Sequence, residues 1–150
     1  MPELTRPIAS EIAGRLEKLS PNTKPLWGNL TAPELIQHLI GTFKQSTGEI
    51  TDLPFVGNWA FEYVVGPLAL AGFLPIPKNL KIKANGKSFP AVNRPGDLND
   101  LRGCMEAYIA GVENGTMKTS YHPYFGDIGS KGWSKMHVKH MRHHLKQFGL

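Results

Sequence analysis

The sequence predicts an all-α protein, a four-helix bundle with one long irregular crossover. Apolar residues recur at three- and four-residue steps in several segments, a spacing typical of amphipathic helices. Turn-forming residues gather between those segments. The longest connection, residues 74–96, holds four prolines and two glycines and shows no convincing pair of strands, since only Lys81 to Lys83 alternates. Amphipathic helices joined in this way favour a bundle.

The first two predicted helices have clear ends. The first lies within residues 5–20 and stops at Ser20, because Pro21 disfavours helical backbone in the residue before it. The second, residues 31–46, opens with Thr31 and carries Glu34 three residues later, which is the pattern of a capping box. Their apolar stripes are Ile8, Ile12, Leu16 and Leu19 in the first helix, and Ile36, Ile40 and Phe43 in the second.

Further helices are expected in the second half of the chain. One covers about residues 58–71 and is broken or bent near Gly66 and Pro67. It belongs to the most apolar stretch, residues 55–77, which we expect to lie in the core. The next helix starts at Asp97 as its cap. The last runs from about residue 131 to residue 148 and stops at Gly149.

Length and composition bound the class of protein. The 150 residues predict one domain, residues 1–150, that is large enough to bury a core. The opening residues do not resemble a signal peptide, and Glu62 and Pro67 interrupt the most apolar stretch, so we expect no membrane insertion. The single cysteine, Cys104, allows no disulfide within the chain, and we expect a packed helix residue rather than a nucleophile. We therefore expect a cytoplasmic protein.

The net charge of +5 raises the question of nucleic-acid binding. Five basic residues of the last helix fall within one sector of about 80°, on the side away from most of its apolar residues. We expect this sector to be a solvated face, and no aromatic residues or recognition motif accompany it. Nucleic-acid binding is therefore disfavoured. The five residues are Lys131, Lys135, Lys139, Arg142 and Lys146.

Four of the six histidines crowd into residues 137–144 of the last helix. With His137 at 0° and about 100° per residue, His144 falls at about 340° and His140 at about 300°, both beside the apolar side. His143 falls at about 240° and points away. His137 and His144 are about 10.5 Å apart along the axis, too far to share one ion easily. Of the feasible pairs, His140 with His144 has the i, i+4 spacing of helical metal sites, so we favour it over His137 with His140.

Two ligands are too few, so a third has to come from another element. His38 flanks the apolar stripe of the second helix, at a position from which a side chain reaches across a bundle. His122, in the loop "YHPYFG", is the other candidate. A lone histidine beside a core is more often packed or hydrogen-bonded than a ligand, and a basic, histidine-rich C-terminus is also compatible with a solvated face.

Several segments resemble one branch of the DinB/YfiT-like superfamily of metalloenzymes, a branch known mainly as a domain of unknown function. "HPYFG", then Trp133, then "HMRHHLKQFG" look like its C-terminal signature. "LWGNLTAPELIQHLIG" resembles its tryptophan-glycine loop and first histidine helix, and "GPLALAGFLPIPKN" its middle segment. The resemblance spans about residues 16–149. It implies a four-helix bundle with a divalent metal held by a histidine triad, His38, His140 and His144.

The resemblance also implies chemistry. Characterised relatives include transferases and isomerases that use low-molecular-weight thiols. Three neutral imidazoles leave coordination positions for a thiolate or water, which suits either thiol transfer or hydrolysis. Zinc, nickel and iron fit such a donor set equally. We therefore expect a small-molecule substrate, and a low-molecular-weight thiol would suit the site. The chain could also associate with a second copy as a homodimer.

Two hypotheses follow from the sequence. The leading one is a metal-dependent transferase or hydrolase. The alternative is a non-catalytic metal-binding or protein-interaction module on the same bundle. An open coordination position facing a pocket would favour catalysis, and a fourth protein ligand would favour a structural site. Gln147 either hydrogen-bonds near the metal or caps the helix end, and Trp133 either walls the site or belongs to the core; the roles of His122, His137 and His143 stay open.

Overall fold

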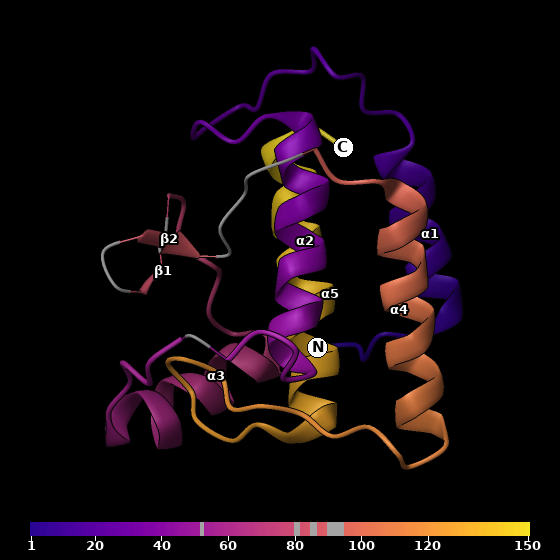
Figure 1. The fold of residues 1–150 in the computed structure, drawn as a ribbon. Helices are drawn as coiled ribbons and strands as arrows, with labels where there is room; N and C mark the ends of the chain where they lie inside the picture. Colours follow the sequence, from indigo (N-terminus) through magenta and orange to yellow (C-terminus); the bar gives the residue numbers. More distant parts are fainter. Residues whose placement is uncertain (52, 80–81, 85–86, 90–94) are drawn as a thin grey trace.

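The fold is built almost entirely from helices. The computed structural model describes residues 1–51, 53–79, 82–84, 87–89 and 95–150. Figure 1 shows the four long helices, which are α1 (Arg6–Leu16), α2 (Ala32–Ser46), α4 (Leu98–Glu113) and α5 (Gly129–Gln147). Between α2 and α4, a π-helical turn, η1 (Phe61–Val65), continues into the short helix α3 (Gly66–Ala71), and the strands β1 (Ile82–Ala84) and β2 (Lys87–Phe89) pair. The expected all-α class is confirmed.

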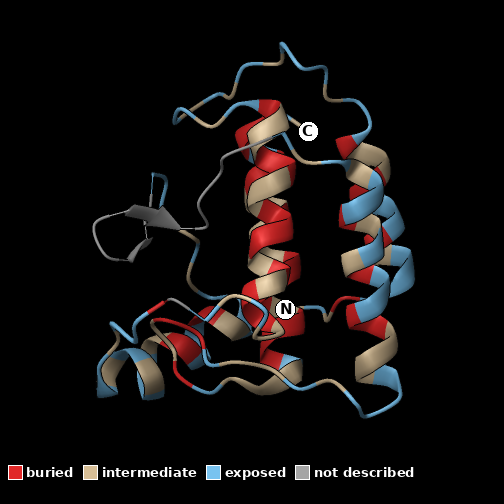
Figure 2. Cartoon of the chain, in the orientation of Figure 1, coloured by how far each residue is buried: buried red, intermediate tan, exposed pale blue. Residues whose placement is uncertain are grey.

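The four long helices pack side by side around a common core. Helix α2 packs against α4 and α5, and α1 packs against the same two helices (Figure 1). In Figure 2 buried residues line the facing sides of these helices, whereas exposed residues cover much of the outer side of α1 and α4. The apolar stripes read from the sequence therefore do form the core. Its fully buried side chains include Ile12, Leu35, Leu39, Leu101, Met105, Val138 and Leu145.

Two helix starts are held by the side chains that the sequence predicted. The Glu34 backbone N–H donates to Thr31 Oγ1 at 3.4 Å, and the Thr31 backbone N–H donates to Glu34 Oε2 at 2.9 Å. At the start of α4, Asp97 Oδ1 accepts from the backbone N–H groups of Asn99 and Asp100. These bonds satisfy N–H groups that have no partner within the helix.

Helix α1 is shorter than expected and ends at Leu16 instead of Ser20. The Lys18 backbone N–H donates to the Arg15 carbonyl and that of Leu19 to the Leu16 carbonyl, so the chain tightens into turns after the helix. Such i to i+3 bonds are a common way to finish a helix. Leu19 still packs against the core from this turn, which explains why it extended the apolar stripe in the sequence.

The expectation that residues 55–77 belong to the core is wrong. Helix α3 buries Gly66 and Ala69, whereas Trp59 and Tyr63 are 72% and 70% exposed. The close approach of the backbone explains why a small residue faces inward, since a Cβ at Gly66 would lie 3.2 Å from the side chain of Phe125. At the position of the predicted bend or break the hydrogen-bond pattern changes, since the π-helical turn η1 gives way to α3 at Gly66 and Pro67 occupies the first turn of α3. The backbone of Val65 and Gly66 stays in the right-handed helical region.

The crossover contains a pair of strands that the sequence pattern did not predict. Strands β1 and β2 are antiparallel, with Ile82 opposite Phe89 and Ala84 opposite Lys87. Lys81, which was part of the only alternating piece, lies outside the described residues.

The basic sector of α5 is not simply a solvated face. Lys139 Nζ donates to the backbone carbonyls of Ala69, at 2.6 Å, and of Leu74. Arg142 reaches Glu11 of α1 at 3.4 Å. Helix α5 contacts α1, α2 and α3, so even its polar side is partly covered. None of the described helices combines the length and the apolar character needed to cross a membrane.

The capping box makes a stability prediction. Thr31→Ala removes the oxygen that caps α2, so we expect it to lower the free energy of unfolding by about 1 kcal/mol. Thr5→Ala is the matched control, because Thr5 stands at the N-cap of α1 without a side-chain capping bond. Urea unfolding at neutral pH measures both variants. Equal losses in the two would contradict the assigned role of Thr31.

Candidate metal centre

Three histidines from two helices meet where α2 packs against α5. His140 and His144 are one turn apart on α5 and therefore lie on the same face of that helix. His38 stands on α2, next to residues of its buried stripe, and its ring faces His140 and His144 on α5. The three rings contact one another edge to face, with centroids 4.6 to 4.9 Å apart. The arrangement brings together the two residues that helical projection paired, His140 and His144, and His38, one of the two candidates for a third ligand.

The ring nitrogens converge on one point. His140 Nε2 lies 3.0 Å from His38 Nε2 and 2.9 Å from His144 Nε2. One nitrogen of each ring lies within 4.8 Å of the corresponding atoms of the other two. Two nitrogens that each stand about 2.1 Å from one ion are separated by about 3 Å or slightly more. The spacing therefore fits a single divalent ion.

Protons alone satisfy this cluster poorly. A neutral imidazole carries one N–H and one lone pair, and His140 Nε2 is shared by two short contacts. If this atom donates to His144, it has no lone pair left to accept from His38. If it accepts from His38, its lone pair faces the lone pair of His144 Nε2, because the proton of His144 is held on Nδ1 by Gln147. A cation among the three nitrogens is a partner for all of them at once.

Burial keeps these rings neutral at physiological pH. Desolvation lowers the pKa of His38 to about 3 and that of His144 to about 4, and nearby histidines add to the effect. The pKa of His140 is well below its ordinary value for the same reasons. Neutral imidazole is the form that binds metals, so ligation requires no proton to leave these side chains near neutrality.

Gln147 fixes the orientation of His144. Its Nε2 donates to the Trp27 carbonyl at 2.8 Å, so its Oε1 is the atom that faces His144 Nδ1, at 2.7 Å. Because an amide oxygen only accepts, Nδ1 must carry the proton, and the lone pair of His144 lies on Nε2 toward the cluster. Of the two roles that the sequence left open for Gln147, hydrogen bonding beside the site is the one observed.

Trp27, which no sequence pattern marked as a site residue, lies at the edge of this network. Its ring meets His143 edge to face at 5.9 Å between centroids, and Lys78 Nζ stands 4.5 Å from its ring centre. Its backbone carbonyl anchors Gln147. His143 is half-buried and packs against the ring of His144, 5.3 Å between centroids, without joining the convergent nitrogens. The projection that turned His143 away from the other two is in keeping with this position.

His137 has a structural environment. It is fully buried, stacks on Phe43 and lies 2.9 Å from Ser46 Oγ through Nε2. The Ser46 hydroxyl already donates to the Phe43 carbonyl, so it accepts from His137, and that nitrogen has no lone pair for a metal. Trp133 is 2% exposed and stacks on the same ring, as expected of a core residue.

His122, the alternative third candidate, does not join the cluster. Its Nδ1 accepts from the backbone N–H groups of Tyr124 and Phe125, and its ring stacks on that of Phe125. Its backbone pairs with Gly126 in a tight loop. The side chain therefore holds the "HPYFG" loop in shape, and its burial lowers its pKa to about 4.

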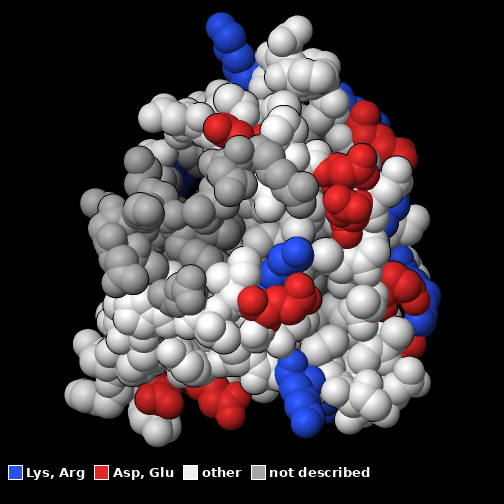
Figure 3. Space-filling model, in the orientation of Figure 1, with Lys and Arg blue, Asp and Glu red and all other residues white. Residues whose placement is uncertain are grey.

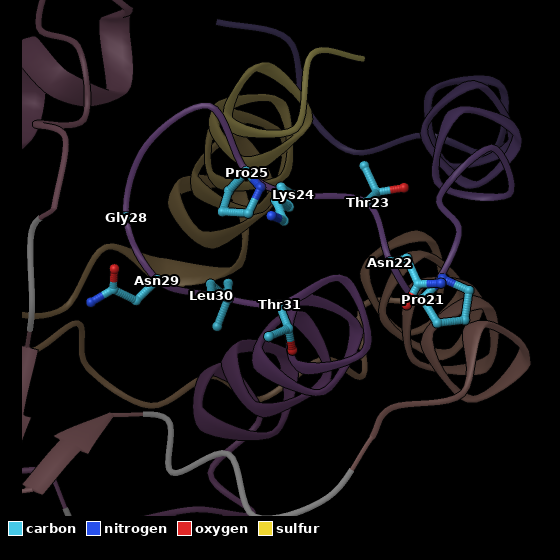
Figure 4. A pocket seen from close by; sticks show the side chains of 9 residues that line it. All are labelled: Pro21, Asn22, Thr23, Lys24, Pro25, Gly28, Asn29, Leu30 and Thr31. Atoms are coloured by element: carbon cyan, nitrogen blue, oxygen red, sulfur yellow. The ribbon is translucent and has the colours of Figure 1, made fainter.

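Two surface hollows lie away from the three histidines. One is formed by the loop that joins α1 to α2 (Figure 4), and Lys24 is its only charged residue. The other lies between α2 and α4 and includes Lys44, Asp100 and Cys104. Burial raises the pKa of the Cys104 thiol, so it stays protonated and is a poor nucleophile. Neither hollow is lined by a member of the cluster.

Comparison with other proteins adds no assignment. No family model matches the chain, and no curated protein and no solved structure is detectably similar to it. The interpretation of the site therefore depends on its own geometry.

The buried histidines predict how stability depends on pH. Burial lowers the pKa of His137 to about 3 and that of His122 to about 4, from about 6.5 in the unfolded chain. Below pH 6.5 the unfolded chain binds these protons and the folded chain does not, so stability falls as pH falls. We expect a loss of about 1.4 kcal/mol per pH unit for each histidine between about pH 6 and pH 4.5. Urea unfolding of metal-free protein in chelator tests this, and an unchanged free energy from pH 7 to pH 5 would contradict it.

Gln147 predicts a graded effect on metal binding. Gln147→Leu removes the acceptor for His144 Nδ1–H but leaves all three histidines, so we expect divalent-metal affinity to fall by about 10- to 100-fold. Lys146→Leu is the matched control, since Lys146 is exposed on the same turn. Competition titration with a coloured chelator measures both. Wild-type affinity in Gln147→Leu, or a complete loss of binding, would contradict the role assigned to this amide.

Proposed function

We propose that the chain is a metal-dependent enzyme whose divalent ion is held by His38, His140 and His144. The observation that carries the proposal is the convergence of three Nε2 atoms, two of them 3.0 and 2.9 Å from the third. Neutral side chains, a fixed tautomer at His144 and the lack of a satisfactory proton arrangement all support a cation there. Zinc, nickel and iron remain the candidate ions.

A catalytic role is favoured over a structural one by the number of ligands. Structural zinc sites take four protein ligands, whereas catalytic sites use three and keep a position open. Among the residues that the structure describes, the cluster contains three histidines and no carboxylate or thiol. As whole residues, His38 and His140 are partly exposed, whereas His144 is buried. A bound ion of this kind lowers the pKa of a thiol or of water at its open position.

The protein side chains would hold the ligands in place and leave the positive charge of the ion undiminished. Gln147 and the Trp27 carbonyl hold His144 in one tautomer, and the packing of α2 on α5 holds His38 opposite it. Because all three ligands are neutral, the ion keeps its full positive charge to act on an anionic ligand. A thiolate is such a ligand, and this favours a low-molecular-weight thiol as a substrate or co-substrate.

The resemblance of the sequence to the DinB/YfiT-like superfamily agrees with this proposal. In that superfamily a four-helix bundle uses one early histidine and two late ones, four residues apart, and relatives carry out thiol-dependent transfer. We propose the same fold type and the same broad chemistry here, with hydrolysis as the other reaction open to such an ion. The alternative is a non-catalytic metal-binding module, in which no coordination position of the ion is open to a substrate or to exchanging water.

Alanine variants test the ligand set. Purified without a histidine tag, the wild-type chain should bind one divalent ion, and His38→Ala, His140→Ala and His144→Ala should each lose tight binding, because two imidazoles remain. His143→Ala is the matched control and should bind nearly as the wild type does, since its ring lies beside His144 outside the convergent group. Zinc titration of each variant measures this. Loss in His143→Ala with retention in His38→Ala would overturn the ligand set.

The cobalt(II)-loaded protein tests whether a position is open. Titration with 2-mercaptoethanol should produce a sulfur-to-cobalt charge-transfer band and change the visible spectrum, because a thiolate enters the coordination sphere. A saturated site would show neither change. Cobalt bound by the three histidines with no response to the thiol would support the non-catalytic alternative and contradict an open position.

A further inference from the structure

The segment around η1 and α3 places its large and small residues in an unusual way. Gly66 and Ala69 are buried, whereas Trp59, Tyr63 and Phe73 are 72%, 70% and 77% exposed. A helix of a monomer normally turns its large apolar residues inward. The apolar patch, as we call it, comprises Phe55, Val56, Trp59, Phe61, Tyr63, Val64, Leu68 and Phe73, each at least 38% exposed.

The chain is held firmly beneath the start of this patch. The backbone N–H groups of Val56 and Gly57 donate to the Pro123 carbonyl at 2.8 and 3.1 Å. A Cβ at Gly57 would overlap the carbonyl of Tyr124, so the two segments are in close contact. The ring of Phe61 packs on that of Tyr124, 5.7 Å between centroids. The surface is thus already formed before any partner arrives, which lowers the entropic cost of association.

The amount of exposed apolar surface is that of an interface. At roughly 200 Å² per large aromatic residue, Trp59, Tyr63 and Phe73 together expose on the order of 400 Å². With the five less exposed members, the exposed area of these residues, polar and backbone atoms included, comes to roughly 700 to 800 Å². The largest apolar patch of a monomer is typically about 300 to 600 Å², and each partner of a standard interface contributes about 800 Å².

The charges around the patch decide between partners. No lysine or arginine occurs between Lys44 and Lys78, and Glu62 is the only charged residue of residues 53–77. In Figure 3 the lower left of the molecule, over η1 and α3, is mostly uncharged with some acidic atoms and no basic ones. Anionic membrane surfaces and nucleic acids attract basic residues, so neither suits this patch.

We propose that the apolar patch is the interface of a homodimer. A surface that meets its own copy can bring like charges together, so a chain of net charge +5 associates with less repulsion through a segment that carries no basic residue. Homodimer interfaces are also more apolar than those of transient complexes. The patch satisfies both conditions and is large enough for a stable two-fold contact.

Sedimentation equilibrium of the full chain tests this interface. The wild type should be a dimer, and Trp59→Arg with Tyr63→Arg should weaken it at least 30-fold, because central aromatic residues dominate binding and each change adds a charge that meets its own copy. Phe73→Arg, at the other end of the segment, should also weaken it. Leu26→Arg is the matched control, since Leu26 is 70% exposed but lies on the α1–α2 loop outside the patch. Circular dichroism verifies that each variant is folded.

Each other outcome would overturn the proposal. A wild type that stays monomeric at about 100 μM has no dimer affinity in the micromolar range, which leaves the patch without a second copy. A dimer that survives the patch changes, or that Leu26→Arg also breaks, uses another surface. Assemblies larger than a dimer contradict a closed two-fold contact. A monomer that binds neutral phosphatidylcholine vesicles through Trp59, seen as a blue shift of its fluorescence, would assign the patch to lipid.

Discussion

The proposed chemistry depends on the contact between α2 and α5, because this contact makes three neutral imidazoles share one small space. Burial makes protonation costly, and Nε2···Nε2 distances of 2.9 and 3.0 Å leave lone pairs without enough protons to separate them. Around this point the surrounding residues are specialised: Gln147 fixes one ring, and α1 and α4 complete the core that presses α2 onto α5. A polar cluster with this much unmet bonding is costly to stability unless a ligand uses it.

The histidines of α5 show how neighbours in sequence take different roles. His137 donates to Ser46 inside the aromatic core, His140 and His144 turn Nε2 toward α2, and His143 lies beside Trp27. Helical geometry explains the division, since each step of about 100° presents the next side chain to a different neighbour. The hydrogen-bond partners then fix which nitrogen of each ring is free. A ring nitrogen can offer its lone pair to a metal only if it does not already take part in a hydrogen bond, as His137 Nε2 does with Ser46.

Sequence periodicity was sufficient for the existence of the four long helices, the caps of α2 and α4, and the pairing of His140 with His144, because these depend on local spacing. Spacing alone left His38 and His122 open as the third ligand, and only the resemblance to the DinB/YfiT-like superfamily favoured His38. Periodicity did not place the end of α1. It failed where tertiary contacts decide. Trp59 and Tyr63 were expected in the core but are exposed. The apolar composition of a short helix does not tell which of its faces packs against the rest of the protein. The hairpin was missed although Asn85-Gly86, a favoured hairpin dipeptide, stands between its strands in the sequence. The bond from Gln147 to Trp27 joins residues 120 apart and left no local signal.

Ring-nitrogen NMR of the ¹⁵N-labelled chain at neutral pH tests the central claim most directly. Before metal is added, all three cluster histidines should be neutral, with His144 protonated at Nδ1. One equivalent of zinc should then shift the Nε2 signals of His38, His140 and His144 and leave those of His122 and His137 in place. Imidazolium signals from the cluster at neutral pH, or a zinc response at His137 in place of His38, would contradict the account.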